Sequence, residues 1–212
     1  MSETKKGLCI TIVSLVLFII LIILLKTVDV KEVGLSGLNN LYLHDYNKAL
    51  DIISDVLLYL SFVAFLAAVV YFIYKLIKTK TVDYRFLVYF LVMVVVVFLY
   101  LVFEHLIKIN GRPYEPEEAS FPSTHVLLAT YILLPITTFF FRKNREEVDQ
   151  KIDKETVISL IAFIIIGVMV VLRFWSGDHW LTDSIGGLIL GVFAFGVYYF
   201  LSSLIMDKKS LE

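Results

Sequence analysis

Three ionisable side chains lie close together at the edge of an apolar segment: Arg173, His179 and Asp183. Ionisable residues beside a membrane-spanning segment are functional candidates by default. His179 and Asp183 stand at positions i and i+4, so they share one face of the helix that we expect to begin here. With Asp183 bound to one imidazole nitrogen, the other nitrogen can act as a nucleophile or a base. The spacing therefore predicts a reactive histidine.

Positive side chains accompany this histidine, because Arg112 and Lys108 lie upstream of Arg173. An arginine guanidinium binds two phosphate oxygens at once, and a lysine adds a point charge. Phosphoryl transfer requires cations on the oxygens, a nucleophile in line with the leaving group, and a proton for the departing oxygen. We therefore expect a phosphoryl-transfer site in which His179 attacks phosphorus and carries the phosphoryl group.

The segment around Pro122 supplies the remaining groups. Pro122 lies just before an apolar run, which predicts that Ser123, Thr124 and His125 form the opening turn of a helix. Unpaired backbone N–H groups and the helix dipole attract an anion to such a turn. His125 is then placed to protonate the leaving oxygen as a general acid. The predicted phosphate-binding residues are Lys108, Arg112, Ser123, Thr124 and Arg173.

The elements that must position these side chains are membrane spans. The chain has 212 residues, of which 59% are hydrophobic, and a mean hydropathy of +0.85. Soluble domains are usually about 45–50% apolar, and about 20 apolar residues are needed to cross a bilayer. We predict an all-α, polytopic membrane protein with six transmembrane helices, over residues 8–25, 56–74, 86–103, 126–141, 156–172 and 184–206.

Lysine and arginine are concentrated in two of the loops between these spans, at residues 75–85 and 142–154. The positive-inside rule places both loops in the cytoplasm, together with the two termini. The loops at 27–50, 104–125 and 173–183 then lie outside. We therefore predict a multi-pass protein of the cell membrane with its active site at the extracytoplasmic edge.

No linker or repeat divides the chain, so we predict a single membrane-embedded domain over residues 1–212. Residues 28–51 mix apolar and polar side chains, which fits either a short helix on the outer membrane surface or a packed connector. Gly187 and Gly191 form a small-xxx-small pair in the last span, which favours close helix packing.

We expect neither a metal ion nor a cofactor. Cys9 is the only cysteine, so no disulfide within the chain and no cysteine metal site can form. Glu115, Glu117 and Glu118 form an acidic run, but no histidine or further carboxylate has the spacing to complete a metal site, so we interpret the run as a solvated loop. The expected partners are membrane lipids and a phosphate-bearing substrate, which the family resemblance described next implies is a lipid phosphate; we expect no nucleic acid, and the oligomeric state is left open.

The three polar segments together resemble the signature of the type 2 phosphatidic acid phosphatase (lipid phosphate phosphatase) superfamily, in its bacterial six-span form. The family pattern is Lys-x6-Arg-Pro, Pro-Ser-Gly-His and Ser-Arg-x5-His-x3-Asp. This chain has Arg112-Pro113, Pro122-Ser-Thr-His125 and Leu172-Arg173-x5-His179-x3-Asp183, within a motif region of residues 104–187. The resemblance implies a metal-independent phosphatase that acts on lipid phosphates at the membrane surface through a phosphohistidine intermediate.

The chain departs from this pattern at three positions. His105 stands where the family has its first lysine, and Lys108 lies about one helical turn further along. We favour Lys108 as the cation because a lysine is charged at neutral pH without help. Thr124 replaces a glycine, which keeps the backbone N–H group but narrows the pocket, and Leu172 replaces a serine, which removes one hydrogen bond to the phosphate.

The sequence leaves the substrate and the acceptor open. Phosphatidic acid, phosphatidylglycerol phosphate and undecaprenyl diphosphate all fit the site, and attack by an alcohol instead of water would make the protein a lipid phosphotransferase. A transporter that binds an anion or lipid without chemistry is a further alternative. Against it, the polar residues lie at one membrane edge and not at the midplane, where transport sites lie.

Overall fold

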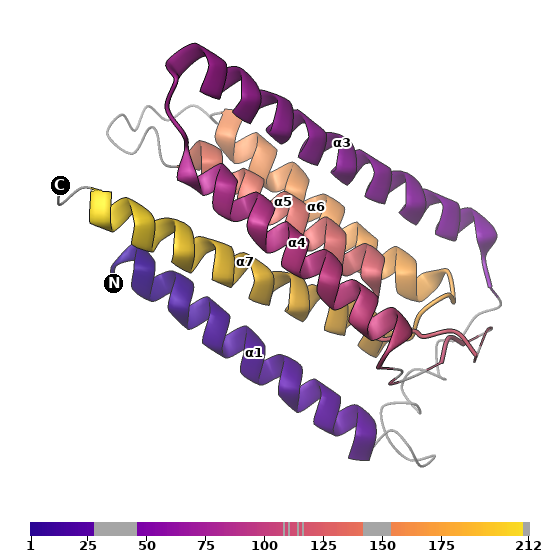
Figure 1. Cartoon of the computed structure of the whole chain (residues 1–212). Coiled ribbons are helices and arrows are strands. Elements are labelled where there is room, and N and C mark those ends of the chain that lie inside the picture. Colours follow the sequence, from indigo (N-terminus) through magenta and orange to yellow (C-terminus); the bar gives the residue numbers. More distant parts are fainter. Residues whose placement is uncertain are drawn as a thin grey trace.

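The computed structural model describes residues 1–27, 46–107, 109, 111–113, 115, 117–141 and 154–209. Within these residues the chain forms six α-helices and no strand, which confirms the predicted all-α fold (Figure 1). The helices are α1 (Glu3–Thr27), α3 (Lys48–Thr79), α4 (Tyr84–His105), α5 (Thr124–Phe141), α6 (Lys154–Trp175) and α7 (Leu181–Lys209).

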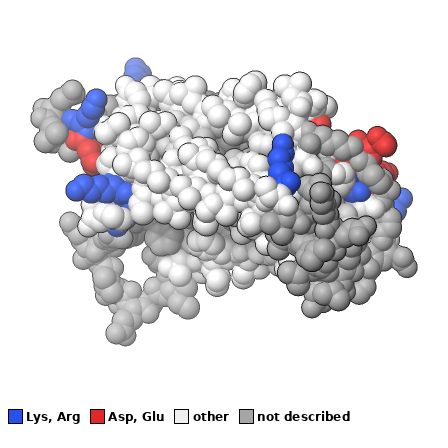
Figure 2. Space-filling view, turned by 90° about the horizontal axis from the view of Figure 1, so that it is seen from below, with Lys and Arg blue, Asp and Glu red and all other residues white. Residues whose placement is uncertain are grey.

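The described helices have the length and the surface of membrane spans. Five of them are long and apolar enough to cross a membrane, and α5 contributes a shorter apolar helix over Thr124–Phe139. Large hydrophobic side chains cover the outside of α3, where Val63 and Val70 are 60% and 66% exposed. Charged side chains gather toward the two ends of the molecule in Figure 2, and the surface between them is largely uncharged. A surface of this kind is stable only against lipid, so the protein is a multi-pass membrane protein.

The beginning of α3 differs from the prediction for residues 28–51. Residues 48–51 belong to the first turn of α3 and not to a surface helix or connector, whereas residues 28–45 lie outside the described part of the chain. Asn47 explains where the helix begins, because its Oδ1 accepts hydrogen bonds from the N–H groups of Ala49 (3.0 Å) and Leu50 (3.3 Å). Such an N-cap satisfies backbone donors that have no partner inside the helix.

Helix α5 lies between its neighbours and contacts α3, α4, α6 and α7. The glycines of α7 allow it to approach α5 closely. A Cβ atom on Gly187 would lie 2.4 Å from the carbonyl oxygen of Ser123, and one on Gly191 would lie 2.6 Å from Cβ of Thr130. Close packing at this glycine pair, which the sequence predicts, holds the start of α7 against the start of α5.

Helices α1 and α7 run antiparallel and are in extensive contact, so both termini lie at one end of the bundle (Figure 1). Thr4 and Asp207 are hydrogen-bonded at 2.5 Å, and the Tyr199 hydroxyl donates to Glu3. The connections that carry the motif residues, between α4 and α5 and between α6 and α7, lie at the opposite end, where α3 begins. The fold therefore gathers the motif residues at one end of the helices.

Candidate active site

His179 lies in the tight connection between α6 and α7. Gly177 takes a positive φ of 75° there, a conformation that favours glycine. Because α7 begins only at Leu181, His179 is not on the helix that carries Asp183, contrary to the prediction. The turn nevertheless brings the two side chains together, with 3.7 Å between Nδ1 of His179 and Oδ2 of Asp183. Asp183 also accepts the backbone N–H of Trp180 at 2.9 Å, which caps α7.

Ser120 fixes the tautomer of this histidine. Its Oγ donates its single hydrogen to Asp183 and lies 3.2 Å from Nδ1 of His179. Because that hydrogen is already used, the hydroxyl can only accept from the ring, so the proton of a neutral His179 lies on Nδ1. The lone pair is then on Nε2, which is the nitrogen that a nucleophile needs.

The electrostatic surroundings keep His179 neutral. Burial, followed by the charge of Arg173, lowers the pKa of His179 well below its ordinary value, although Asp178 opposes the shift. His179 is only 2% exposed. A neutral imidazole at physiological pH has the lone pair required to attack phosphorus.

Arg173 lies in the last turn of α6 and is buried, with 2% of its surface exposed. Its Nη1 donates to Oδ1 of Asp51 at 2.5 Å and to the Ser54 hydroxyl at 3.0 Å, and its Nη2 donates to Asp178. Two of these partners come from the first turns of α3. Helix α3 therefore fixes the guanidinium in its position beside His179.

Arg112 approaches from the connection between α4 and α5, where Gly111 and Ala119 form an isolated β-bridge. Its Nη1 donates to both carboxylate oxygens of Asp178, at 2.9 and 3.0 Å. Trp180 Nε1 donates to the Gly111 carbonyl at 2.9 Å and ties the two connections together. Both predicted arginines thus converge on one point.

That point is occupied by the carboxylate of Asp178. Both Arg112 and Arg173 donate to it, and its Oδ2 lies 3.4 Å from Nε2 of His179. A carboxylate between two guanidinium groups is the arrangement in which proteins also bind phosphate oxygens. The site therefore has the charges and the geometry to bind an oxyanion beside Nε2 of His179.

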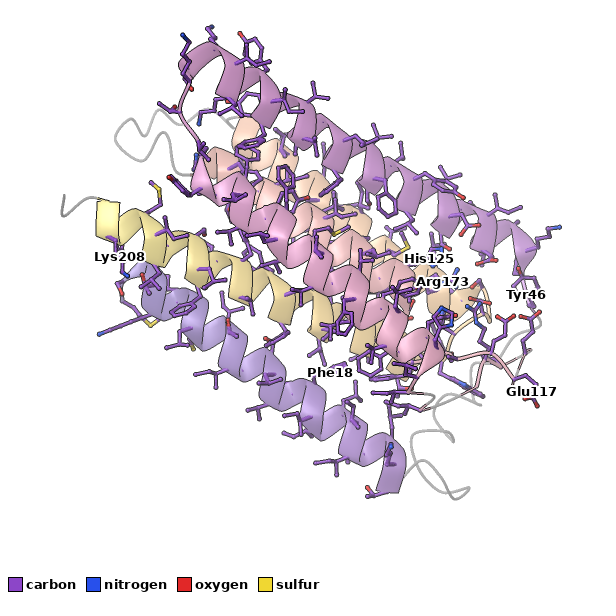
Figure 3. All side chains as sticks on the ribbon, viewed as in Figure 1. Phe18, Tyr46, Glu117, His125, Arg173 and Lys208 are labelled. Atoms are coloured by element: carbon purple, nitrogen blue, oxygen red, sulfur yellow. The ribbon has the colours of Figure 1, made fainter. Side chains whose placement is uncertain are left out.

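His125 reaches the site from the first turn of α5. The backbone N–H of Ser123, just before this helix, donates to the Asp183 carbonyl at 2.9 Å and joins the starts of α5 and α7. His125 places its Nε2 2.8 Å from Oδ1 of Asp55 in α3. In Figure 3, His125 and Arg173 lie at the same end of the bundle as Tyr46 and Glu117, away from Lys208.

Four buried polar atoms of these residues have no hydrogen-bond partner within the described part of the chain: Ser123 Oγ, His125 Nδ1, Arg173 Nε and His179 Nε2. Leaving such an atom buried and unpaired costs roughly 1–3 kcal/mol. A polar ligand bound at this end of the bundle would give these atoms partners.

Comparison with known proteins identifies the family of the chain. The model of the PAP2 superfamily matches residues 100–206, which is half of the chain and includes both histidines and both arginines. The chain belongs to the PAP2 superfamily.

One solved structure extends the likeness to the whole fold. The crystal structure of a transmembrane PAP2-type phosphatidylglycerolphosphate phosphatase from Bacillus subtilis is similar, with a TM-score of 0.60 and 20% sequence identity. The match covers 94% of this chain and 96% of the other. Among curated protein sequences, no match to the chain was found.

Other predicted residues of this PAP2 superfamily member lie less centrally. Thr124 is the first residue of α5 and is partly exposed, and His105 is exposed at the end of α4. Lys108 lies outside the described residues, so the choice between Lys108 and His105 as the first-motif cation remains a prediction. Among the residues that the structure describes, no group of three or more histidine, cysteine or acidic side chains could hold a metal ion.

Five further residues of the site were not predicted from the sequence: Asp51, Ser54, Asp55, Ser120 and Asp178. The first three come from α3, which precedes the segment that matches the PAP2 model. Two carboxylates at i and i+4 beside an apolar span were the available signal for Asp51 and Asp55. Asp178 and Ser120 adjoin the third and second motifs, but nothing in their spacing indicates which atoms they contact.

Proposed function

We propose that this protein hydrolyses a lipid phosphate without a metal ion, through a phosphohistidine on His179. Membership of the PAP2 superfamily supports a phosphatase. The observation that carries the proposal is the Asp178 carboxylate, which bridges Arg112 and Arg173 and lies 3.4 Å from Nε2 of His179. Buried polar atoms of Ser123, His125, Arg173 and His179 without a hydrogen-bond partner in the described residues support it.

In the first step, the substrate phosphate replaces the Asp178 carboxylate between Arg112 and Arg173. Ser123, the N–H groups that begin α5, and Lys108 add further contacts. Nε2 of His179 attacks phosphorus as the bond from phosphorus to the leaving oxygen breaks, and His125 gives that oxygen a proton.

In the second step, water attacks the phosphohistidine. His125, now neutral, accepts a proton from the water as the N–P bond breaks, and inorganic phosphate is released with both histidines restored. Asp183 and Ser120 keep the proton of His179 on Nδ1 throughout, so that the same nitrogen is phosphorylated in each cycle.

A lipid substrate fits the position of the site. The histidines lie at the end of helices whose outer faces are apolar, so a phosphate head group can reach them while its acyl chains stay in the bilayer. We retain phosphatidic acid, phosphatidylglycerol phosphate and undecaprenyl diphosphate as the substrate classes, and one domain over residues 1–212.

The test is phosphate release by purified protein in detergent, over these three substrates and with excess EDTA. We expect release to persist with EDTA and to be inhibited by vanadate, which occupies phosphate sites. His105→Ala should lower release much less than Lys108→Ala, because we favour Lys108 as the first-motif cation and His105 is exposed at the end of α4. A strict magnesium requirement, or no release from any of the three lipids, would contradict the proposal; phosphate transferred to added alcohols would instead identify a phosphotransferase.

We further propose that the site faces the extracytoplasmic side and that both termini are cytoplasmic. Lys75, Lys78 and Lys80 lie at the opposite end of the bundle, as the positive-inside rule requires. In a Cys9→Ser background, a membrane-impermeant maleimide should label Glu117→Cys in intact cells and Lys80→Cys only after permeabilisation. Labelling of Lys80→Cys in intact cells, and of Glu117→Cys only after permeabilisation, would show the opposite topology.

A further inference from the structure

Helix α3 presents three polar side chains to the site from its first turns: Asp51, Ser54 and Asp55. Residues at i, i+3 and i+4 lie on one face of a helix. Helix α3 contacts both α5, whose first turn carries His125, and α6, whose last turn carries Arg173. The part of the chain that precedes the PAP2 match therefore contributes directly to the site.

The three side chains contact two different residues of the site. Asp51 and Ser54 bind Nη1 of Arg173, at 2.5 and 3.0 Å. Asp55 contacts His125 instead, with 2.8 Å between its Oδ1 and Nε2 of the imidazole. The other ring nitrogen of His125, Nδ1, is buried and has no hydrogen-bond partner within the described residues.

We propose that Asp55 is the positioning residue for His125, and that it makes Nδ1 the nitrogen that transfers protons. The inference rests on the proposed function, because it takes His125 to be the general acid. A carboxylate only accepts hydrogen bonds, so Asp55 holds a proton on Nε2 and fixes the orientation of the ring. His179 is held the other way, through Nδ1, and works through Nε2.

The proton balance follows from this orientation. Protonated His125 carries one proton on each nitrogen, with Nε2–H bound to Asp55. As the N–P bond to His179 forms and the P–O bond breaks, the Nδ1 proton passes to the leaving oxygen. Neutral His125 keeps Nε2–H, and Nδ1 then accepts a proton from the attacking water in the second step.

The experiment compares Asp55→Asn with Asp51→Asn, which removes a carboxylate from the same face of α3 that binds Arg173 and not His125. Turnover is measured on a lipid phosphate, whose alkoxide leaving group needs a proton, and on p-nitrophenyl phosphate, whose leaving group does not. Asp55→Asn should lower kcat on the lipid by roughly 10- to 100-fold and much less on the aryl ester, as loss of general-acid catalysis does. Asp51→Asn should raise KM on both substrates.

A double-mutant cycle separates positioning from a structural role. Asp55→Asn should cause no further loss in a His125→Ala background, because its effect passes through that imidazole. A loss of equal size in both backgrounds, equal losses on both substrates, or unchanged lipid turnover in Asp55→Asn would overturn the inference. Where Asp55→Asn is not recovered folded, Asp55→Glu makes the same comparison, because it keeps the charge and displaces the carboxylate; it should show the same leaving-group selectivity.

The His125→Ala variant separates a failure of the proposed function from a failure of the role of Asp55. If its loss is equal on lipid and aryl substrates, the general-acid step of the proposed function fails, whatever Asp55 does. If His125→Ala is selective for the lipid and Asp55→Asn is not, the proposed function stands and the role of Asp55 fails.

Discussion

A carboxylate bridges two cations at each end of the helix bundle. At one end Asp178 lies between Arg112 and Arg173. At the other end Asp83 lies between Lys75, at 2.8 Å, and Arg85, at 2.7 Å. Their surroundings differ, and the difference is the basis for proposing the active site at the Asp178 end.

The Asp83 cluster is locally complete. Asp83 caps α4 by accepting the backbone N–H of Arg85 at 3.2 Å, and the same arginine also binds it through its side chain. Burial alone would raise the pKa of Asp83, but the hydrogen bonds from Arg85 and Lys75 outweigh it and hold that pKa below its ordinary range. No histidine contacts this cluster in the described residues.

A cavity of about 640 Å³ adjoins Lys75 and Arg85, whereas the cavity beside Asp178 measures about 250 Å³. Neither cavity size nor a bridged carboxylate therefore identifies the active site. The end with Asp178 differs by a histidine nitrogen 3.4 Å from the carboxylate and by buried polar atoms that lack partners. Those two features are what a phosphate ligand would use.

The largest expected effect comes from His179→Ala. This variant removes the histidine beside Asp178, and the Asp83 cluster has no histidine in contact with it among the described residues. Turnover should fall by at least about 10⁴-fold, as removal of a covalent nucleophile does. Radiolabelled phosphate trapped on the protein after acid quenching should disappear. Wild-type turnover or persistent labelling in this variant would show that the mechanism is wrong.

Asp183→Asn should have the next largest effect, because Asp183 orients His179 and accepts the hydrogen of Ser120. Loss of tautomer control of this kind costs roughly 10³- to 10⁴-fold in kcat. Ser120→Ala should lose less, since Asp183 still faces Nδ1. A larger loss in Ser120→Ala than in Asp183→Asn would mean that the hydroxyl, and not the carboxylate, controls the ring.

Asp178→Asn should have the opposite effect and improve substrate binding. Because Asp178 occupies the arginines that the phosphate needs, an uncharged side chain should ease substrate binding. We expect KM and the vanadate inhibition constant to fall by roughly 3- to 30-fold, about 0.7–2 kcal/mol. Arg112→Ala is the opposing control and should raise both. An increase of KM in Asp178→Asn would show that the carboxylate holds the arginines in place for the substrate.

The acid limb of kcat/KM should report His179. Its pKa is lowered by burial and then by Arg173, so the neutral, nucleophilic form persists at pH values below the ordinary histidine value of 6.5. Activity should therefore remain as pH falls through 6.5 and decline only at lower pH. If kcat/KM instead begins to decline above pH 6.5, the acid limb belongs to a group other than His179.

Asp83→Asn should have the smallest effect on activity and a measurable effect on stability. Its two cations lose their counter-charge in a mostly buried position, which should lower the free energy of unfolding by about 1–3 kcal/mol. Thermal unfolding in detergent measures the change, and phosphate release checks that kcat and KM stay at wild-type values. A loss of turnover would mean that the two ends of the bundle are coupled.

The sequence predicts much of this arrangement and fails at identifiable places. Hydropathy locates the helices because a membrane span must be apolar. The motif spacing brings Arg173, His179 and Asp183 together because one short connection, which contains His179, joins the last turn of α6 to the first turn of α7. Their catalytic roles remain proposals. Residue spacing cannot predict that Asp55 meets His125, because that contact depends on how α3 is rotated and shifted against α5. The positive φ of Gly177 likewise moves His179 off the helix, an outcome that periodicity cannot show.

The antiparallel pairing of α1 with α7 also constrains how the protein assembles during synthesis. Helix α1 precedes α7 in the chain, so it is synthesised and can enter the bilayer before its main partner exists. Its hydropathy of 3.4 over the most apolar window allows it to wait there as an independent span. Gly7 and Gly196 then allow α7 to dock closely, since a Cβ atom on either would lie within 2.8 Å of the other helix backbone. A bulky residue at either glycine should therefore prevent this docking while the protein is being assembled. Helix α1 would then be inserted but unpaired, and exposed to membrane quality-control proteases.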